Sequence, residues 1–356
     1  MPANPATTSG TARTVRQWAG RLLLLAIGAA ALYGLAPQIF DVFEQTPQLR
    51  ALGWFGLAAM VVCELASFAC AWALHRVALP DLGWFAAGST QLTSNAVSRA
   101  VPGGAAMGGA VSVRMWTIAG VDLGNAAGGL AATSLISTAT LFLLPFIALS
   151  VVVVGVSIPR NLAVVAGGAG VLAVLLFGGG TLLITNDRVA GACARFAGRV
   201  SAPIARRLGR VGLHPEDVMD RRADLADALG DRWHAALGWA VGNWTFDYAA
   251  LAAALLILDH DRPRLSLVLM AYGAAAVLAM IPITPGGLGF VEAGLTSLLT
   301  VAGIPAADAL LATLAYRIVS FWFPLLLGPI AWLAFRRRYH QRLDLEDLPA
   351  VAPAAR

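Results

Sequence analysis

The chain has 356 residues, of which 58% are hydrophobic and 13% are charged, and its formal net charge is +5. Soluble domains contain about 25% charged residues, so a chain this poor in charge cannot cover its apolar surface in water. The composition excludes a disordered protein, an ordinary soluble enzyme and a nucleic-acid-binding domain. We therefore predict an all-α polytopic membrane protein.

Six stretches are apolar over the length of about 20 residues that a membrane-spanning helix requires. In chain order they lie between Arg21 and Asp41, Arg50 and His75, Asp122 and Arg160, Arg160 and Asp187, His234 and Asp259, and Asp308 and Arg336. These six spans define a single integral membrane domain over residues 16–338. Residues 1–15 are expected to be a disordered tail, and residues 339–356 form a second tail.

Two more apolar regions, residues 84–116 and 265–304, do not fit a straight helix. The first contains a run of polar residues and a Pro-Gly-Gly at 102–104, and the second contains a Pro-Gly-Gly at 285–287. Proline removes a backbone hydrogen bond and glycine weakens a helix, so each region is predicted to form a broken or re-entrant helical hairpin. Such backbone needs surrounding protein or a polar cavity at membrane depth.

Arginine placement predicts the orientation, because positive residues collect on the cytoplasmic side of a membrane. Arginines cluster before the first span, in the loop 186–233 and after the last span. Both termini and this basic loop are therefore expected in the cytoplasm, with the protein in the inner membrane of a bacterium. The two hairpins would then enter from opposite sides and belong to two inverted span–hairpin–span repeats, an arrangement typical of transporters. Coincidence is the alternative, since glycine and proline are common in membrane helices.

Six ionisable residues interrupt the apolar spans and hairpins: Glu64, Arg99, Arg114, Asp247, Glu292 and Arg317. Each costs about 2.5–3.5 kcal/mol near the centre of a membrane helix, so each is expected to find a partner inside the bundle. Three acids and three bases allow structural ion pairs. The alternative is an anion site in which the arginines hold a lipid phosphate, while the acids orient them or carry a coupling proton. Polar residues before Arg99, among them Asn95, would line the same cavity.

The residues typical of catalysis and metal binding lack the required spacing. The five His lie in loops or at span ends, and the three Cys show no metal-ligand pattern. The Pro-Gly-Gly-Leu-Gly run lacks the Lys and Ser/Thr of a nucleotide-binding loop. We therefore expect no enzyme activity, no metal and no cofactor.

The second hairpin and the last span contain a recognisable pattern. Residues 281–293 read Ile-Pro-Ile-Thr-Pro-Gly-Gly-Leu-Gly-Phe-Val-Glu-Ala, and residues 315–322 read Ala-Tyr-Arg-Ile-Val-Ser-Phe-Trp. Both resemble the signature of the lysylphosphatidylglycerol synthase transmembrane-region family of flippase-like membrane proteins, and the similar span layout covers roughly residues 15–338. The motif positions that the resemblance makes site candidates are Pro285, Gly286, Gly287, Gly289, Glu292, Tyr316 and Arg317.

The resemblance implies movement of an anionic phospholipid or a polyprenyl-phosphate lipid across the membrane, with anionic lipid headgroups as partners. In bifunctional relatives a separate soluble domain makes the lipid, and a stand-alone member without that domain is expected here. A lipid-modifying membrane enzyme and a non-catalytic membrane partner of an envelope lipid or glycan synthesis enzyme are the alternatives. The chain departs from the family at residues 108–113, which contain no acid where many members place Gly-Glu before the arginine matched by Arg114.

Overall fold

The structure is a computed structural model that describes residues 53–100, 104–152, 232–258, 263–280 and 285–339, with scattered positions between 167 and 192 and Gly230. Every secondary-structure element among these residues is a helix, which confirms the all-α prediction. Several predicted regions lie outside the described residues: the first span, most of the fourth span, the N-terminal tail, nearly all of the basic loop, and the C-terminal tail beyond its first residue.

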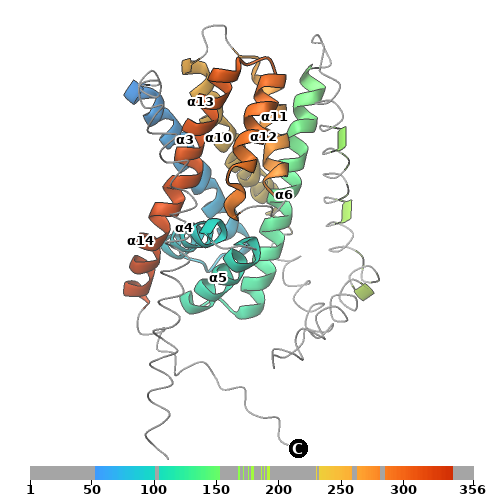
Figure 1. Cartoon of the computed structure of the whole chain (residues 1–356). Coiled ribbons are helices and arrows are strands. Elements are labelled where there is room, and N and C mark those ends of the chain that lie inside the picture. Colours follow the sequence, from blue (N-terminus) through green and yellow to red (C-terminus); the bar gives the residue numbers. More distant parts are fainter. Residues whose placement is uncertain are drawn as a thin grey trace, which may run out of the picture.

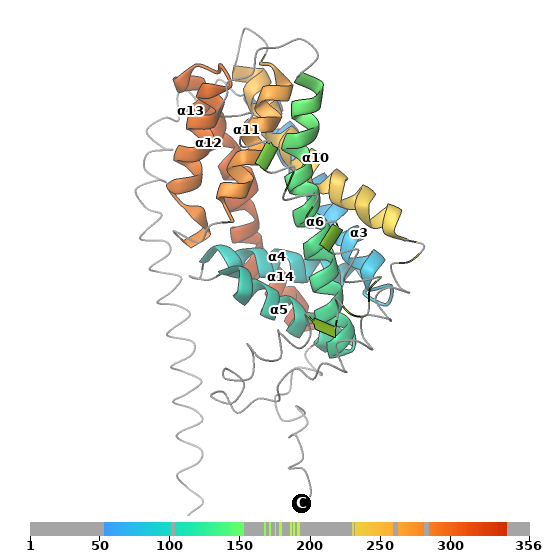
Figure 2. The same cartoon turned by 90° about the vertical axis from the view of Figure 1, so that its right-hand side faces the viewer.

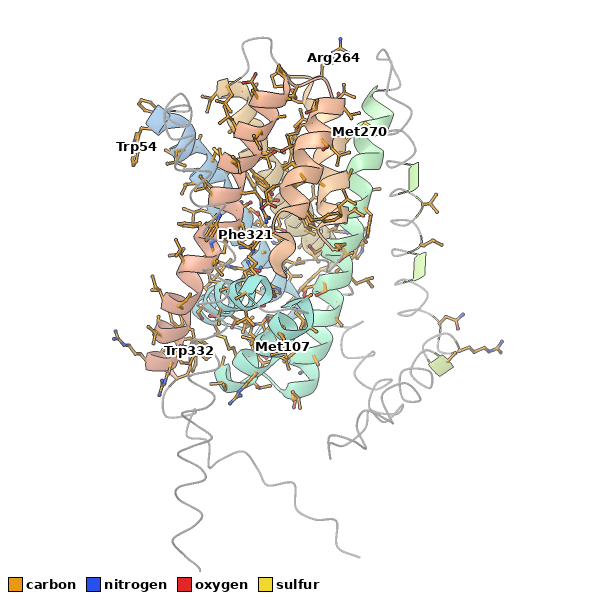
Figure 3. The ribbon with its side chains drawn as sticks, viewed as in Figure 1. Trp54, Met107, Arg264, Met270, Phe321 and Trp332 are labelled. Atoms are coloured by element: carbon orange, nitrogen blue, oxygen red, sulfur yellow. The ribbon has the colours of Figure 1, made fainter. Side chains whose placement is uncertain are left out.

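Four described helical stretches are long and apolar enough to cross a membrane. They are α3 (Gly53–Ala78), α6 (Leu123–Val152), α10 (Trp233–Leu258), and the run of α13 (Ala306–Arg317), the π-helical turn η4 (Ile318–Trp322) and α14 (Phe323–Arg338). These stretches match the second, third, fifth and last predicted spans. Trp54 and Trp332 lie on the outside of the bundle, where an amphipathic ring suits the membrane interface (Figure 3).

The remaining described helices form two hairpins between these spans. The first hairpin consists of α4 (Trp84–Ala100) and α5 (Gly104–Ala119), and the second of α11 (Leu265–Leu278), the 3₁₀ turn η3 (Pro285–Gly287) and α12 (Phe290–Val301). With 14 and 12 residues, α11 and α12 extend only about 21 Å and about 18 Å, less than the ~30 Å hydrocarbon core. Each arm of the second hairpin is therefore shorter than a helix that spans the membrane. Figure 2 shows α4 and α5 lying across the molecule, whereas α11 and α12 run along it.

The packing of the described helices follows a two-fold pattern. Helix α3 packs against α10, the helix that precedes the other hairpin. The first hairpin packs through α4 against α14, and the second packs through α11 against α6, so each hairpin contacts the last span of the opposite repeat (Figure 1). Within each repeat, α5 contacts α6 and α12 contacts α13. These matched contacts agree with two inverted span–hairpin–span units in which each hairpin packs against the last span of the other unit.

Two apolar clusters divide the bundle along its length. The larger cluster joins α10, α11, α12 and α13 and includes the buried Leu255, Met270 and Leu295. The second joins the end of α3 to α4, α5 and α14 and includes the buried Trp116 and Phe335. The polar side chains in the middle of α3, α4 and α10 belong to neither cluster. They meet where the two hairpins approach each other.

Candidate functional site

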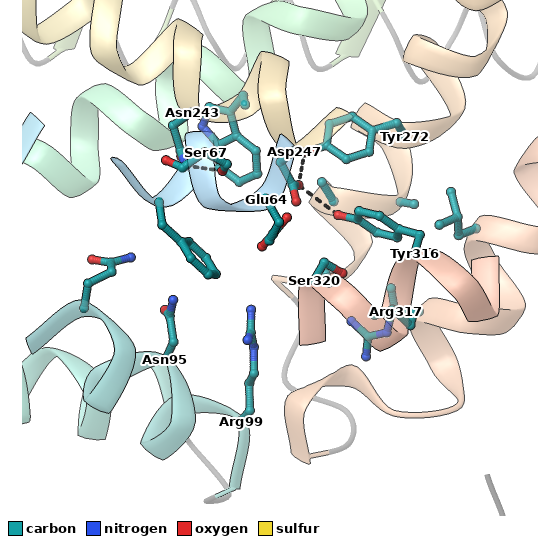
Figure 4. A pocket seen from close by; sticks show the side chains of 18 residues that line it. Glu64, Ser67, Asn95, Arg99, Asn243, Asp247, Tyr272, Tyr316, Arg317 and Ser320 are labelled. Atoms are coloured by element: carbon teal, nitrogen blue, oxygen red, sulfur yellow. Dashed lines mark hydrogen bonds between the residues drawn. The ribbon is translucent and has the colours of Figure 1, made fainter. Parts of the chain in front are cut away.

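A polar cavity of about 280 Å³ lies at the meeting point of the two hairpins (Figure 4). Helices α3, α4, α10, α11 and α13 and the turn η4 all contribute to its wall. Its polar and charged lining consists of Glu64, Ser67, Gln91, Asn95, Arg99, Asn243, Asp247, Tyr272, Tyr316, Arg317 and Ser320. The cavity thus brings together the polar residues that interrupt otherwise apolar helices.

One wall of the cavity is acidic. Asp247 on α10 accepts hydrogen bonds through Oδ2 from the hydroxyl of Tyr272 on α11 and, at 2.8 Å, from that of Tyr316 on α13. Glu64 on α3 is only 2% exposed and lines the same cavity as Asp247 (Figure 4). The two spans that precede the hairpins therefore bring their single carboxyls to the same point.

Neutral hydrogen bonds fix the position of this acidic wall. Asn243 donates to the backbone oxygen of Ser67 at 3.0 Å and to its hydroxyl at 2.7 Å, which ties α10 to α3. Trp244 donates through Nε1 to the backbone oxygen of Ser137 at 2.8 Å, which ties α10 to α6. Buried polar groups satisfied in this way restrict how helices can pack.

The second hairpin is fixed to the last span by an ion pair. Arg317 donates through Nε to Oε1 of Glu292 at 2.6 Å and through Nη2 to the backbone oxygen of Gly286 at 3.3 Å. Gly286 has φ 62°, and a Cβ atom there would lie 2.6 Å from Phe321 and 3.0 Å from the backbone oxygen of Arg99. Only glycine suits both this backbone angle and this close approach. The Pro-Gly-Gly turn, Glu292 and Arg317 thus form one structural unit.

Arg99 occupies the opposite wall, at the tip of the first hairpin. Its side chain points into the cavity (Figure 4), and Nη1 donates to the backbone oxygen of Phe321 at 3.1 Å. Its guanidinium lies 5.3 Å from the centre of the Phe321 ring, and that of Arg317 lies 4.3 Å from the same ring. Among the described residues, no carboxylate forms a salt bridge with Arg99. Phe321 therefore joins the two hairpin tips, and Arg99 keeps a positive charge facing the cavity.

The structure brings most of the predicted site residues together. The predicted residues that line the cavity are Glu64, Asn95, Arg99, Asp247, Tyr316 and Arg317. Glu292 and Gly286 do not line the cavity themselves but bind Arg317, which does. Pro285, Gly287 and Gly289 belong to the turn that precedes α12, where both glycines have positive φ.

Arg114 is the exception. The buried face of α5 contains Gly108, Ser112, Met115 and Trp116, which turns Arg114 to the exposed side of the helix. Arg114 does not line the cavity, so the structure does not place it with Arg99 and Arg317 as the anion-site hypothesis expected.

Two residues at or beside the cavity, Tyr272 and Phe321, were not singled out as site residues from the sequence. Tyr272 binds Asp247 and Phe321 joins the two arginines. The chain has five Tyr, and three of them, Tyr248, Tyr272 and Tyr316, form successive ring contacts beside the cavity. A hydroxyl group inside an apolar helix was the signal that could have indicated Tyr272.

The described part of the chain contains no group of three or more His, Cys, Asp or Glu side chains placed to hold a metal ion. Asn243, Asp247 and Arg317 are instead hydrogen-bonded to residues of other helices. The arrangement can surround a small anionic group with a guanidinium, amides and hydroxyls.

The fold and the site together define a class: a polytopic helical membrane protein with two helical hairpins around a charged central cavity. The chain belongs to the lysylphosphatidylglycerol synthase TM region family, whose model matches residues 18–328. The match confirms the resemblance seen in residues 281–293 and 315–322.

Curated relatives are archaeal membrane proteins. A UPF0104 membrane protein of Methanothermobacter thermautotrophicus is 28% identical over 166 residues, which is 42% of this chain and 47% of the relative. A UPF0104 membrane protein of Pyrococcus horikoshii is 39% identical over 70 residues, which is 20% of this chain and 21% of the relative. The alignments thus span less than half of the relatives they match. No solved structure matches the chain.

Proposed function

We propose that this protein moves an anionic lipid, a phospholipid or a polyprenyl-phosphate lipid, across the cytoplasmic membrane and binds its phosphate in the central cavity. The observation that carries the proposal is the Arg99 guanidinium, which faces a polar cavity at the junction of the two hairpin tips. A buried cation is costly in a membrane protein and marks an ion or substrate pathway. A phosphate group is the natural counterion for such a guanidinium.

The first hairpin offers an ordered set of donors for a headgroup. Gln91, Asn95 and Arg99 all line the cavity and follow one another at intervals of four residues, so they share one face of α4. A cavity of about 280 Å³ accommodates a phosphate with a small polar substituent but not the acyl chains of a lipid. The chains would stay in the bilayer while the headgroup passes along this face.

The proposal includes no bond-making step by the protein itself. Asp247, Tyr272 and Tyr316 bind one another, and Arg317 binds Glu292. These groups shape and charge the cavity, which suits binding and release of a headgroup rather than its chemical conversion.

The decisive variant is Arg99→Gln in proteoliposomes that contain a fluorescent phosphatidylglycerol. Loss of the charge is expected to slow transfer between leaflets about tenfold or more, because a hydrogen bond to a charged group contributes about 1.5–3 kcal/mol. Arg114→Gln is the matched control, since it removes the same charge from an exposed position outside the cavity. Transfer by Arg99→Gln at the wild-type rate, in a protein of unchanged thermal stability, would contradict the proposal.

The alternative is a non-catalytic membrane partner of an envelope lipid or glycan synthesis enzyme. The family description favours it in one respect, because it names this region as part of a synthase. This alternative predicts that wild-type protein alone accelerates no lipid transfer and that Arg99→Gln leaves the phenotype of the cell unchanged.

A further inference from the structure

We propose that Glu64 and Asp247 form a proton-exchange site, and that proton uptake at this pair is coupled to binding of the anionic headgroup at Arg99. The inference deepens the proposed function and rests on it, because it names the ion that drives movement of the lipid. Glu64 and Asp247 lie on the buried wall of the cavity, opposite the polar side chains of α4 (Figure 4).

The first observation is a buried oxygen atom that lacks a partner. Glu64 is 2% exposed and lines the cavity, and its Oε2 has no hydrogen-bond partner among the described residues. An ionised carboxylate can only accept hydrogen bonds. A buried acceptor without a donor is unfavourable and is relieved when the carboxyl group itself carries a proton.

The second observation is the position of Asp247. Its carboxyl group lines the same cavity as that of Glu64, and two carboxylates in one water-poor site repel each other unless one of them carries a proton. Tyr272 and Tyr316 already donate to Oδ2 of Asp247, whereas no described residue donates to Oε2 of Glu64. The geometry therefore directs an exchangeable proton to the Glu64 side of the pair.

The surrounding charges explain how a lipid would affect this proton. The titratable and charged groups that face the pair from neighbouring elements are Arg99 on α4, Tyr272 on α11, and Tyr316 and Arg317 on α13, with Cys63 beside Glu64 on α3 and Glu292 bound to Arg317. These described residues supply two cations and three carboxyls. A phosphate at Arg99 adds a further negative charge to this set, which favours a proton on Glu64.

Binding of headgroup and proton is therefore mutually favourable, and thermodynamic linkage makes the effect reciprocal. Acid on one side of the membrane loads the cavity with proton and lipid together. On the opposite, less acidic side the pair releases its proton, and the headgroup leaves a cavity that has become more negative. The proton gradient thus supplies the driving force.

The proton site is tested first without any lipid movement. Infrared difference spectra of the full-length protein in lipid nanodiscs should show the C=O stretch of a protonated carboxyl group, and the intensity of this band should depend on pH. The band should be lost in Glu64→Gln and retained in Asp308→Asn, which changes a carboxyl group outside the cavity. No such band in wild-type protein, or an unchanged band in Glu64→Gln, overturns the proposal.

The coupling is tested in proteoliposomes with fluorescent phosphatidylglycerol. An imposed pH gradient should accelerate wild-type transfer toward the alkaline side about fivefold or more, whereas an equal sodium gradient should not. The ratio of rates with and without the pH gradient should fall to about one in Glu64→Gln and stay at the wild-type value in Asp308→Asn. If the rate of wild-type transfer does not change with the pH gradient, the coupling is overturned but the proposed lipid transfer is not. Absence of any transfer overturns the coupling together with the proposed function, while the infrared band still decides the proton site.

Discussion

The two hairpins occupy equivalent places in the inverted repeat but have different chemistry. Helix α4 of the first hairpin presents Gln91, Asn95 and Arg99 to the cavity. Helix α11 of the second is almost entirely apolar, with Tyr272 as its polar contribution to the lining, and the Pro-Gly-Gly turn and Glu292 bind Arg317. In a symmetric fold, the polar side chains of one hairpin thus face the cavity, whereas those of the other bind the last span. The comparison predicts that substitutions in the second hairpin change stability and that substitutions in the first change function.

Glu292→Ala should have the largest effect on stability. It leaves the guanidinium of Arg317 without its carboxylate in a pair whose side chains are only 12% and 14% exposed. Breaking a buried pair costs about 3–5 kcal/mol, and thermal unfolding in detergent should show a large fall in midpoint. Asp308→Ala is the matched control, because Asp308 also lies in the first turn of a helix. Equal destabilisation by both variants would show that the ion pair does not hold the hairpin.

Gly286→Ala should destabilise the protein by about 2–4 kcal/mol, since it combines a left-handed backbone angle with a collision against Phe321. Gly303→Ala is the control: Gly303 has φ 97°, and a Cβ atom there would meet nothing within 4 Å. The difference between the two unfolding midpoints measures the contact between the hairpin tips. Equal shifts would mean that this contact contributes nothing beyond backbone strain.

Asn95→Ala should separate function from stability in the first hairpin. The amide lines the cavity on the same face of α4 as Arg99, so its removal should reduce lipid transfer about threefold to tenfold, as expected for one hydrogen bond. The unfolding midpoint should change little. Asn125→Ala, at an exposed position on α6, should leave both quantities unchanged. A large loss of stability in Asn95→Ala would show that α4 also stabilises the fold. The two hairpins would then not differ in their contribution to stability.

The predicted orientation can be tested without any assay of function. Single cysteines at Asp81, in the loop before the first hairpin, and at Ala307, just after the second, are exposed and should react with an impermeant reagent from opposite sides. Cys63, Cys70 and Cys193 are first replaced. The positive-inside rule places Ala307 outside the cell. Labelling of both from the same side would overturn the inverted arrangement.

Much of the fold could be predicted because it depends on composition along the chain. Long apolar stretches indicated α3, α6, α10 and the last span, and the Pro-Gly-Gly turns indicated the hairpins. The carboxyls Glu64 and Asp247 were conspicuous because each interrupts an apolar span. All of these signals are local in sequence.

The pairing inside the site could not be predicted in the same way. Glu292 and Arg317 were both candidates, but nothing in the sequence identified them as partners. Arg114 was expected at the anion site because it is a charged residue in an apolar hairpin. Because α5 is apolar around most of its circumference, the sequence did not indicate which face of this helix is buried. Phe321 was missed because its position depends on the backbone of η4 and on the approach of two helix tips.

The π-helical turn η4 has a consequence for the evolution of chain length. Before it, Tyr316 and Arg317 serve the cavity, and beyond it the backbone oxygen of Gly328 accepts a hydrogen bond from Thr93 on α4 at 3.4 Å. The π-helical turn accommodates its extra residue locally, so the two α-helical halves of the span keep their contacts. Deleting one residue from α13 or α14 has no such compensation and would rotate the two halves relative to each other by about 100°, which would separate α14 from α4. This segment should therefore tolerate substitutions far better than a change in length.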